Sequence, residues 1–283
     1  MKKSQFLISA LLLIITSNCS SAQEASLKEH LLFYASFDGQ SSAEIARGNN
    51  QIYTAENYKN ASKAKAGLHD SKVVLAKGQG RFGDALHFTE SKTSAVFYKA
   101  FKNVGHNKTS WSGTVSFWLR LDPNKGLPPH YCDPICITDT KWSDAGLWVD
   151  FTDHAVRKFR FGAMGDLAVW DPDGTSDESD WNKRTVTVDP SPFTATSWTH
   201  VALVYSNVNT STPNYKLYLN GVFQGEISRI NDPFTWEAQN GKIMLGLGYI
   251  GLLDELAIFN KALDDSEIKR VFKAKDGVKG LIK

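Results

Sequence analysis

The amino-acid sequence predicts an all-β protein in which two antiparallel sheets pack as a sandwich, with one short helix near the C-terminus. Short apolar stretches recur along the chain, and Gly, Asn, Asp and Pro residues separate them, as is typical of sandwiches and barrels. Aromatic residues make up 12% of the 283 residues and only three are Met, a composition that favours strands. Hydrophobic residues reach 42%, so the chain can bury a large core and is not of the disordered class.

The clearest strand is predicted at residues 113–121. Val115, Phe117 and Leu119 share one face and the residues between them share the other, which is the alternation of a strand with one buried face. Residues 40–80 are polar and are expected to form long loops with one or two short strands around residues 73–75. Further strands are expected at residues 31–37, 73–75, 85–88, 94–98, 147–151, 157–161, 199–205, 215–219, 222–225, 242–247 and 252–259.

One helix is expected, starting after Asp264. Asp264 is a favoured N-cap residue, and Glu267 three positions later completes a capping box. Ile268, Val271 and Phe272 then form an apolar stripe at helical spacing. This pattern predicts a short amphipathic helix.

The N-terminus has the pattern of a secretory signal. Lys2 and Lys3 precede an apolar stretch, residues 6–15, which is too short for the roughly 20 residues that cross a bilayer as a helix. We expect cleavage before Gln23; the alternative is a lipoprotein that carries its lipid on Cys19. In both cases the protein is expected outside the cytoplasm, secreted, periplasmic or in the cell envelope.

The expected organisation is a signal peptide at residues 1–22, a linker at 23–30, one sandwich domain at 31–272 and a C-terminal tail at 273–283. Loss of the signal removes two lysines and no acidic residue, so the formal charge falls from +2 to zero. A neutral chain gives no electrostatic reason to bind nucleic acid or an anionic membrane surface.

Two cysteines, Cys132 and Cys136, remain after removal of the signal. In an oxidising compartment they are expected to form a disulfide around the turn-prone pair Asp133-Pro134. The alternative is a metal site that adds His130, but it lacks the second pair of ligands that zinc sites usually have.

Five stretches resemble the laminin-G-like jelly roll of the concanavalin A-like lectin/glucanase superfamily. They read GRFGDALHF, VSFWL, WTHVALVY, KLYLNG and GLLDELAIFNKAL, at residues 80–88, 115–119, 198–205, 216–221 and 251–263. Their order and span, about residues 31–272, imply a concanavalin A-like sandwich of two curved sheets. The resemblance does not imply one function, because the fold hosts lectins, glycanases, lyases and adhesion modules.

The resemblance also implies a structural calcium site. Related proteins use an acidic residue in a turn near the first strand together with the Asp of the last strand, which correspond here to Asp38 and Asp254. Asp84 is a weaker third candidate. Ca²⁺ prefers about six to eight oxygen ligands, which carboxylates and turn carbonyls supply. The alternative is that Asp38 caps a turn and that Asp254 or Glu255 pairs with a lysine.

A second acidic segment lies between Trp170 and Trp181. Asp171, Asp173 and Asp177 could surround a cation, although the spacing departs from that of an EF-hand loop. The alternative is a solvated surface loop. Exposed Trp side chains at its two ends could stack on sugar rings.

The candidate ligand-binding strip lies on the predicted hairpin of residues 147–161. If the apolar side chains face the core, the opposite face presents aromatic and charged groups that suit glycans, because indoles stack on sugar C–H surfaces and charges bind hydroxyl or acidic groups. The alternative is a register shifted by one residue, which would bury the Trp side chains. The strip contains Trp148, Asp150, Lys158 and Arg160, with Trp170 in the adjacent loop and Trp118 and Arg120 on an expected neighbouring strand.

The sequence contains no recognisable catalytic motif. Retaining glucanases of this superfamily carry an E-x-D-x-x-E strand, and this pattern is absent; Asp150 and Asp153 would lie on opposite strand faces. The sequence therefore favours an exported, non-catalytic module that binds a glycan or glycoconjugate. The alternatives are a polysaccharide-active enzyme and a protein-binding adhesion or envelope component.

Overall fold

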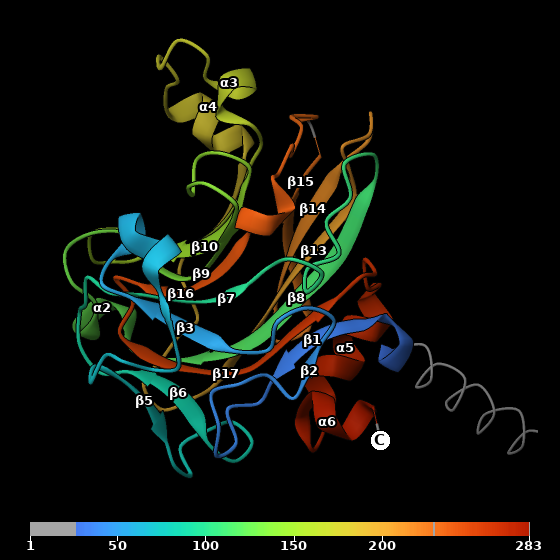
Figure 1. Ribbon diagram of the computed structural model, residues 1–283. Helices are drawn as coiled ribbons and strands as arrows, with labels where there is room; N and C mark the ends of the chain where they lie inside the picture. Colours follow the sequence, from blue (N-terminus) through green and yellow to red (C-terminus); the bar gives the residue numbers. More distant parts are fainter. Residues whose placement is uncertain (1–26, 229, 283) are drawn as a thin grey trace, which may run out of the picture.

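Two antiparallel sheets pack against each other and enclose the main hydrophobic core (Figure 1). The computed structural model describes residues 27–228 and 230–282. Sheet A has the strand order β15 (Val222–Ile227), β14 (Asn214–Leu219), β13 (Thr199–Val208), β8 (Trp111–Arg120), β17 (Gly251–Phe259), β1 (Leu31–Ala35) and β2 (Ile45–Ala46), with β6 (Ala85–Phe88) on β17 and β5 (Val73–Ala76) on β6. Sheet B has the order β12 (Thr185–Val188), β11 (Phe159–Met164), β10 (Gly146–Phe151), β9 (Cys132–Thr138), β16 (Lys242–Leu247), β7 (Ala95–Lys99), β3 (Ile52–Ala55) and β4 (Lys65–Ala66).

Short helices lie outside the two sheets. In Figure 1, α3 and α4 project at the top of the view above β10, whereas α5 and α6 lie beside β1 and β17. Besides the helical residues 27–30, the helices of the described residues are η1 (Tyr58–Lys63), α2 (Pro123–Gly126), α3 (Leu167–Trp170), α4 (Glu178–Lys183), η2 (Ala238–Asn240), α5 (Asp265–Lys273) and α6 (Gly277–Leu281).

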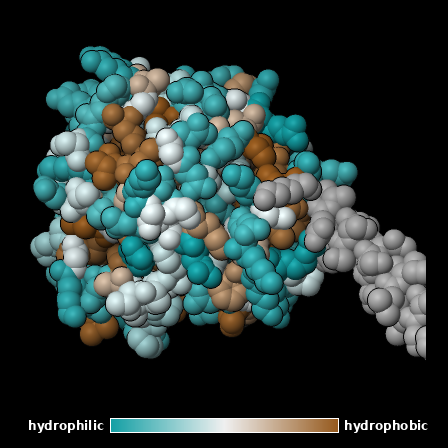
Figure 2. Space-filling view, turned by 90° about the horizontal axis from the view of Figure 1, so that it is seen from below, coloured by the Kyte–Doolittle hydropathy of each residue, from teal (hydrophilic) through white to brown (hydrophobic). Residues whose placement is uncertain are grey.

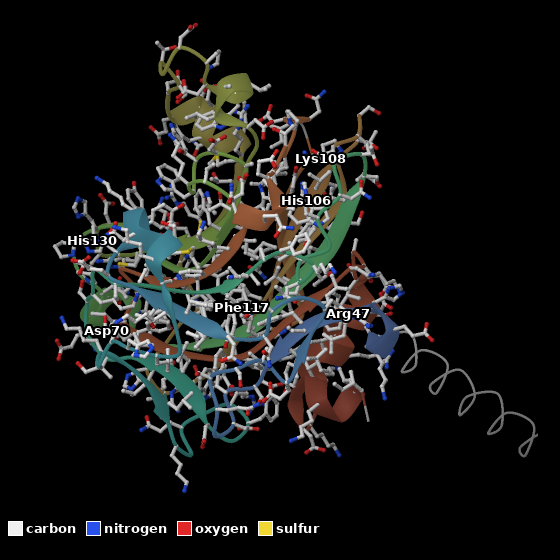
Figure 3. The ribbon with its side chains drawn as sticks, viewed as in Figure 1. Arg47, Asp70, His106, Lys108, Phe117 and His130 are labelled. Carbon is white, nitrogen blue, oxygen red and sulfur yellow. The ribbon has the colours of Figure 1, made fainter. Side chains whose placement is uncertain are left out.

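The predicted alternation of the strands is confirmed. Phe117 of β8, Val149 of β10 and Phe161 of β11 are fully buried in the core between the sheets, and Phe117 lies near the centre of the molecule in Figure 3. The hairpin of β10 and β11 is also confirmed, with Val149 opposite Phe161. A strand of period two places its apolar side chains on one face, so the polar face of this hairpin is turned away from the core.

The outer face of sheet A is covered by α5 and α6. Asp264 caps α5 as predicted, because its carboxylate accepts hydrogen bonds from the backbone of Ser266 and Glu267. Ile268 and Val271 then pack on the sheet, together with Val278 of α6. The segment expected as a tail thus contributes to a second, smaller core.

Trp118 and Arg120 lie on this covered face of sheet A, so the expectation that they extend the strip on the β10–β11 hairpin was wrong. The Trp118 side chain is only 4% exposed and stacks on Phe272 of α5 at 5.7 Å. The guanidinium of Arg120 lies over the ring of Trp198. The alternation of β8 was correct, but its neighbours in sheet A are β13 and β17 rather than β10.

The predicted disulfide is not formed, because residues 132–136 belong to strand β9 rather than to a turn. Cys136 pairs with Trp148 of β10 and belongs to the outer cluster, whereas Cys132 pairs with Phe151, whose ring lies in the core. Both thiols are free. Four residues of strand span about 13 Å, well beyond the roughly 4.4–6.8 Å between the Cα atoms of a disulfide.

The signal peptide, its cleavage before Gln23 and the alternative lipid anchor at Cys19 lie outside the described residues. Leu27, at the start of the described chain, is fully buried against the outer face of sheet A. None of the described helices is long and apolar enough to cross a membrane.

The lower face of the molecule is shown in Figure 2. Its hydrophobic patches are small, and hydrophilic surface separates them. Such scattered patches are ordinary on a protein surface and need no partner to explain them.

Candidate binding site

A cavity of about 880 Å³ opens on the outer face of sheet B. Its floor is formed by β9, β10 and β11, and its walls come from η1, the 139–145 loop and α4. The volume falls within the roughly 300–1,000 Å³ of small-molecule sites. The outer face of sheet B therefore contains an open cavity, whereas the outer face of sheet A is covered by helices.

The indole of Trp148 forms part of the floor. Trp148 lies opposite Gly162 in the β10–β11 pair, and a Cβ atom at Gly162 would lie 2.2 Å from two atoms of its ring. The absence of a side chain at Gly162 thus lets the indole lie against the sheet. Trp148 is only 2% exposed, so the prediction that it points into solvent was wrong, although its assignment to the outer face was correct.

Trp142 and Trp181 extend the aromatic surface along one wall. Their rings stack at 5.3 Å with an interplanar angle of 29°, and Trp142 meets Trp148 edge-on at 6.2 Å. Trp142 is 46% exposed. Tyr58 of η1 and Tyr131 also line the cavity, so five aromatic side chains surround the space.

Trp142 is a functional candidate that the sequence interpretation missed. It lies in a tight loop in which the Thr138 hydroxyl donates to the carbonyls of Lys141 and Asp144, each at 3.0 Å. A large apolar side chain in a polar turn is unusual on a protein surface. The run Lys-Trp-Ser-Asp between two strands was the available signal.

Trp170 does not reach the cavity, contrary to the prediction that it is an exposed ligand-binding residue. Its side chain is 8% exposed, its indole N–H donates to the Ser143 carbonyl at 3.1 Å, and Arg184 lies over its ring. Trp170 meets Trp181 edge-on at 4.9 Å. It therefore supports the aromatic wall from behind.

An ion pair lies beside Trp148 on the floor. The Arg160 guanidinium donates to both carboxylate oxygens of Asp150, at 2.9 and 2.5 Å. Burial raises the pKa of Asp150, and the bonds from Arg160 oppose that rise. Arg160 also lies over the rings of Tyr131 and Trp148. A bidentate pair of this kind is rigid and leaves little net charge.

Asp133 is the neighbour of this pair on β9. Its carboxyl lies deep in the cavity, where burial and the nearby Asp150 raise its pKa well above the usual value. Lys158 does not line the cavity, and its ammonium pairs with Asp189 at 3.1 Å. Of the five ligand-binding residues predicted, the structure thus brings Trp148, Asp150 and Arg160 together and leaves Lys158 and Trp170 apart.

The acidic segment folds into two short helices, α3 and α4, joined by a loop. The Asp177 carboxylate caps α4 by accepting from the backbone of Ser179 and Asp180, and Asp171 accepts from the Ser176 backbone at 2.9 Å. Within residues 27–228 and 230–282, no group of three or more His, Cys, Asp or Glu side chains could hold a metal ion. The expected cation thus has no site between Asp171, Asp173 and Asp177. Asp177 is among the residues that line the cavity.

The expected calcium ligands gather around the loop of residues 78–84. The backbone N–H of Asp84 donates to Asp38 at 2.9 Å, and the backbone N–H of Gly39 donates to Asp84 at 3.0 Å. Asp254 of β17 is fully buried and accepts from the backbone of Arg81 and Phe82 at 2.6 and 3.1 Å. Asp38 and Asp254 thus hold the same loop from two sides.

These acids have little compensating positive charge. Burial, with the neighbouring Glu255, raises the pKa of Asp254 to about 8, and burial raises the pKa of Glu255 to about 7. Among the residues that the structure describes, neither Asp38, Asp84, Asp254 nor Glu255 forms an ion pair. Because no group of three or more His, Cys, Asp or Glu side chains among residues 27–228 and 230–282 could hold a metal ion, a hard cation here would have only Asp38 and Asp254 as carboxylate ligands and would take its other oxygens from turn carbonyls.

A second cavity, of about 390 Å³, lies elsewhere. It is lined by Arg47, His106 and Trp236, among others, and Figure 3 places His106 far from His130, which lines the larger cavity. The His106 ring stacks on Trp236 at 4.9 Å. This cavity is less than half the size of the first and offers no comparable aromatic wall.

A family profile described as the concanavalin A-like lectin/glucanases superfamily matches residues 98–269. Among solved structures, domain 4 of AbnA, a GH43 extracellular arabinanase from Geobacillus stearothermophilus, in complex with arabinotriose, is similar at 19% identity and a TM-score of 0.51. The alignment covers 85% of this chain and 98% of that domain.

Binding domains of botulinum neurotoxins are similar in fold as well. The binding domain of neurotoxin DC, in complex with rat synaptotagmin II, has 15% identity and a TM-score of 0.56 over 87% of this chain and 52% of that one. A structure of neurotoxin type C, described as dependent for cell entry on two ganglioside molecules, has 16% identity and a TM-score of 0.56 over 88% and 52%. No curated protein sequence matches the chain significantly.

Proposed function

Because the chain belongs to the concanavalin A-like lectin/glucanase superfamily, we propose that it is a non-catalytic glycan-binding module whose site is the cavity over β9, β10 and β11. The observation that carries the proposal is the aromatic surface of Trp142, Trp148 and Trp181 around polar groups. Sugar rings present C–H surfaces to indole faces and hydroxyls to the surrounding polar groups. A partly exposed Trp beside a deeper one suits this kind of ligand.

Proteins of similar fold support the proposal. The structure of the arabinanase domain is described as a complex with arabinotriose, and the type C neurotoxin is described as interacting with gangliosides. Identities below 20% carry the fold to this chain but not the ligand. The choice of glycan must therefore come from the chemistry of the cavity itself.

A glycan array tests the proposal. The wild-type protein is expected to bind a subset of glycans, and Trp142→Ala is expected to weaken that binding at least tenfold, since an aromatic anchor at a binding surface is worth roughly 2 kcal/mol or more. Phe223→Ala is the matched control, because Phe223 is also 46% exposed but lies on β15. Equal binding by wild type and Trp142→Ala would contradict the cavity as the binding site. Absence of binding to any glycan would contradict the proposed glycan-binding function.

We propose in addition that a structural Ca²⁺ binds at Asp38 and Asp254, with Asp84 beside them. The uncompensated acids around residues 78–84 support this site. The ion would tie the loop after β1 to the last strand and so stabilise the sandwich. Its role is structural, because these residues do not line the glycan cavity.

The N-terminal pattern of Lys2, Lys3 and residues 6–15 supports export, and we propose that the protein acts outside the cytoplasm. There it would meet free polysaccharides and glycoconjugates. N-terminal sequencing of the protein recovered from its native host tests this: a start at Gln23 supports secretion, a blocked and lipidated Cys19 supports the anchor, and an intact Met1 contradicts export.

A polysaccharide-active enzyme is a second candidate, and one observation favours it. Asp133 and Asp150 lie on adjacent strands of the cavity floor, and glycosidases use two carboxyl groups in different environments. The bidentate bond from Arg160 to Asp150 makes that carboxylate a poor nucleophile. Release of reducing ends or unsaturated uronides that Asp133→Asn abolishes would favour the enzyme.

A further inference from the structure

The charges around the cavity are unbalanced toward the negative. Asp133, Asp150, Asp177 and Glu178 line it, against Arg160 and Lys141 as the basic residues, with His130 at the rim. Asp150 and Arg160 compensate each other through their bidentate bond. Burial raises the pKa of Asp133 well above its usual value, so the charged acids that remain, Asp177 and Glu178, face one exposed lysine, Lys141.

Arg160 and Lys158 are already engaged, and Lys141 is the one lysine or arginine of the cavity that forms no ion pair among the described residues. Arg160 holds Asp150, and Lys158 pairs with Asp189 outside the cavity. Within the described part of the chain, Asp177 and Glu178 of the α4 wall have no ion-pair partner. An approaching carboxylate or sulfate would thus meet two unpaired acids and one lysine, and no free guanidinium, so the net like charge disfavours such a ligand.

The aromatic walls favour the opposite charge. Tyr58, Tyr131, Trp142 and Trp181 surround the same space, and the faces of Trp and Tyr rings attract cations. The carboxyl of Asp133 opens onto the cavity and forms no hydrogen bond within residues 27–228 and 230–282, so it remains available to a ligand. Aromatic faces and uncompensated acids together form an environment for an ammonium group.

On the basis of the proposed glycan-binding function, we propose that the cavity selects a protonated amino sugar over its neutral counterpart and rejects acidic sugars. The exposed indole of Trp142 would hold the ring, with the buried Trp148 on the floor below it. Asp177 and Glu178 of the α4 wall would hold the ammonium group and would repel uronates and sulfates.

The test uses the purified full chain on an array of neutral, amino, uronate and sulfated oligosaccharides. It continues with titrations of matched β-1,4-linked trimers of glucosamine, N-acetylglucosamine, glucose and glucuronate. The glucosamine trimer is expected to bind more tightly than the neutral trimers, and the glucuronate trimer least tightly. The preference should decrease as the salt concentration rises to about 0.5 M, because the Debye length is then shorter than ~10 Å and the attraction between exposed charges is screened.

A double variant assigns the preference to the α4 wall. Asp177→Asn with Glu178→Gln keeps the helix cap, because Asn also caps well, and it removes two charges. The amino-sugar preference is expected to fall about sevenfold, the effect of two charges at about 7 Å in a largely aqueous setting. Asp173→Asn, an exposed residue of the same segment outside the cavity lining, is the control and should change nothing.

Two results would overturn the inference while leaving the proposed function intact. One is tightest binding of a uronate or sulfated glycan that Trp142→Ala abolishes. The other is an amino-sugar preference that the double variant leaves unchanged. Binding to no glycan of any class would instead overturn the proposed function and the inference with it.

Discussion

Replacing Gly162 by Ala places a methyl group under the Trp148 indole. The new Cβ atom would lie 2.2 Å from ring atoms Cε2 and Cζ2 and 2.6 Å from Cη2. Carbon atoms pack at about 3.5–4.0 Å, so the rigid indole must move by more than about 1 Å. It cannot move freely, because Trp142 meets its edge and Arg160 lies over its face.

The sign of the stability change is informative. Gly162 lies within β11 and has no left-handed backbone conformation, and Ala is ordinarily favoured over Gly in such a position by roughly 0.5–1 kcal/mol. Overpacking costs about 1–3 kcal/mol. We therefore expect a net loss of about 1–2 kcal/mol, or a decrease of about 2–8 °C in Tm for a domain of this size.

The measurement is thermal unfolding followed by circular dichroism, together with titration of the best glycan from the array. Glycan binding should weaken at least tenfold, because the floor of the cavity changes shape. Gly126→Ala is the control, since no atom lies within 4 Å of a Cβ there, and its Tm should be unchanged or slightly higher. An equal or higher Tm for Gly162→Ala, with unaltered binding, would refute the placement of Trp148 against the sheet.

Three further predictions concern the rest of the molecule. Millimolar Ca²⁺ should raise Tm relative to chelator, because an ion at a hundredfold excess over its Kd stabilises the folded state by about 2.7 kcal/mol. Asp38→Asn should abolish the rise in Tm, and equal Tm values in calcium and chelator would exclude the ion. Burial lowers the pKa of His200 to about 3, so its contribution to stability is present above pH ~6.5 and is lost by up to about 1.4 kcal/mol per pH unit as the pH falls toward 3. In denaturant titrations between pH 7 and 4, the free energy of unfolding of His200→Gln should depend less on pH than that of the wild type. An equal pH dependence of the two proteins would contradict this. Loss of the α5 cap in Asp264→Ala should cost about 1 kcal/mol and 2–4 °C in Tm, whereas Asp276→Ala should have little effect because Asp276 makes no side-chain capping bond; equal losses in both variants would speak against the cap.

The strands and their faces could be predicted because their signal is local. In β8, β10 and β11 the side chains alternate between core and outside with a period of two, and this pattern needs no knowledge of the partner strand. The Asp264–Glu267 capping box is equally local, and the helix begins where it predicts. These features place Trp148, Asp150 and Arg160 on one face without any structure.

The errors arise where a neighbour distant in sequence decides the outcome. Asp133-Pro134 suggested a turn, but β9 is an interior strand that carries this pair at an irregularity in its pairing with β10, and a bulge tolerates proline inside a sheet. The exposure of Trp148 and Trp170 depends on contacts from Trp142, Arg160 and Arg184 that no periodicity shows.

The grouping of the cavity depends on the same long-range contacts. Trp142 and Trp181 are 39 positions apart and stack because the 139–145 loop and α4 meet above β10. The sequence predicts a role for Trp181 only because this residue ends the acidic segment, and the sequence interpretation did not include Trp142. Pairing across strands and loops, rather than residue type, made them into one surface.

A crystal structure of the protein with the tightest-binding oligosaccharide from the array tests the central claim most directly. We expect a sugar ring stacked on Trp142 and reaching Trp148 on the floor of the larger cavity, with polar contacts to the α4 wall. A sugar bound instead beside His106 and Trp236, or on the covered face of sheet A, with the larger cavity unchanged, would contradict the account.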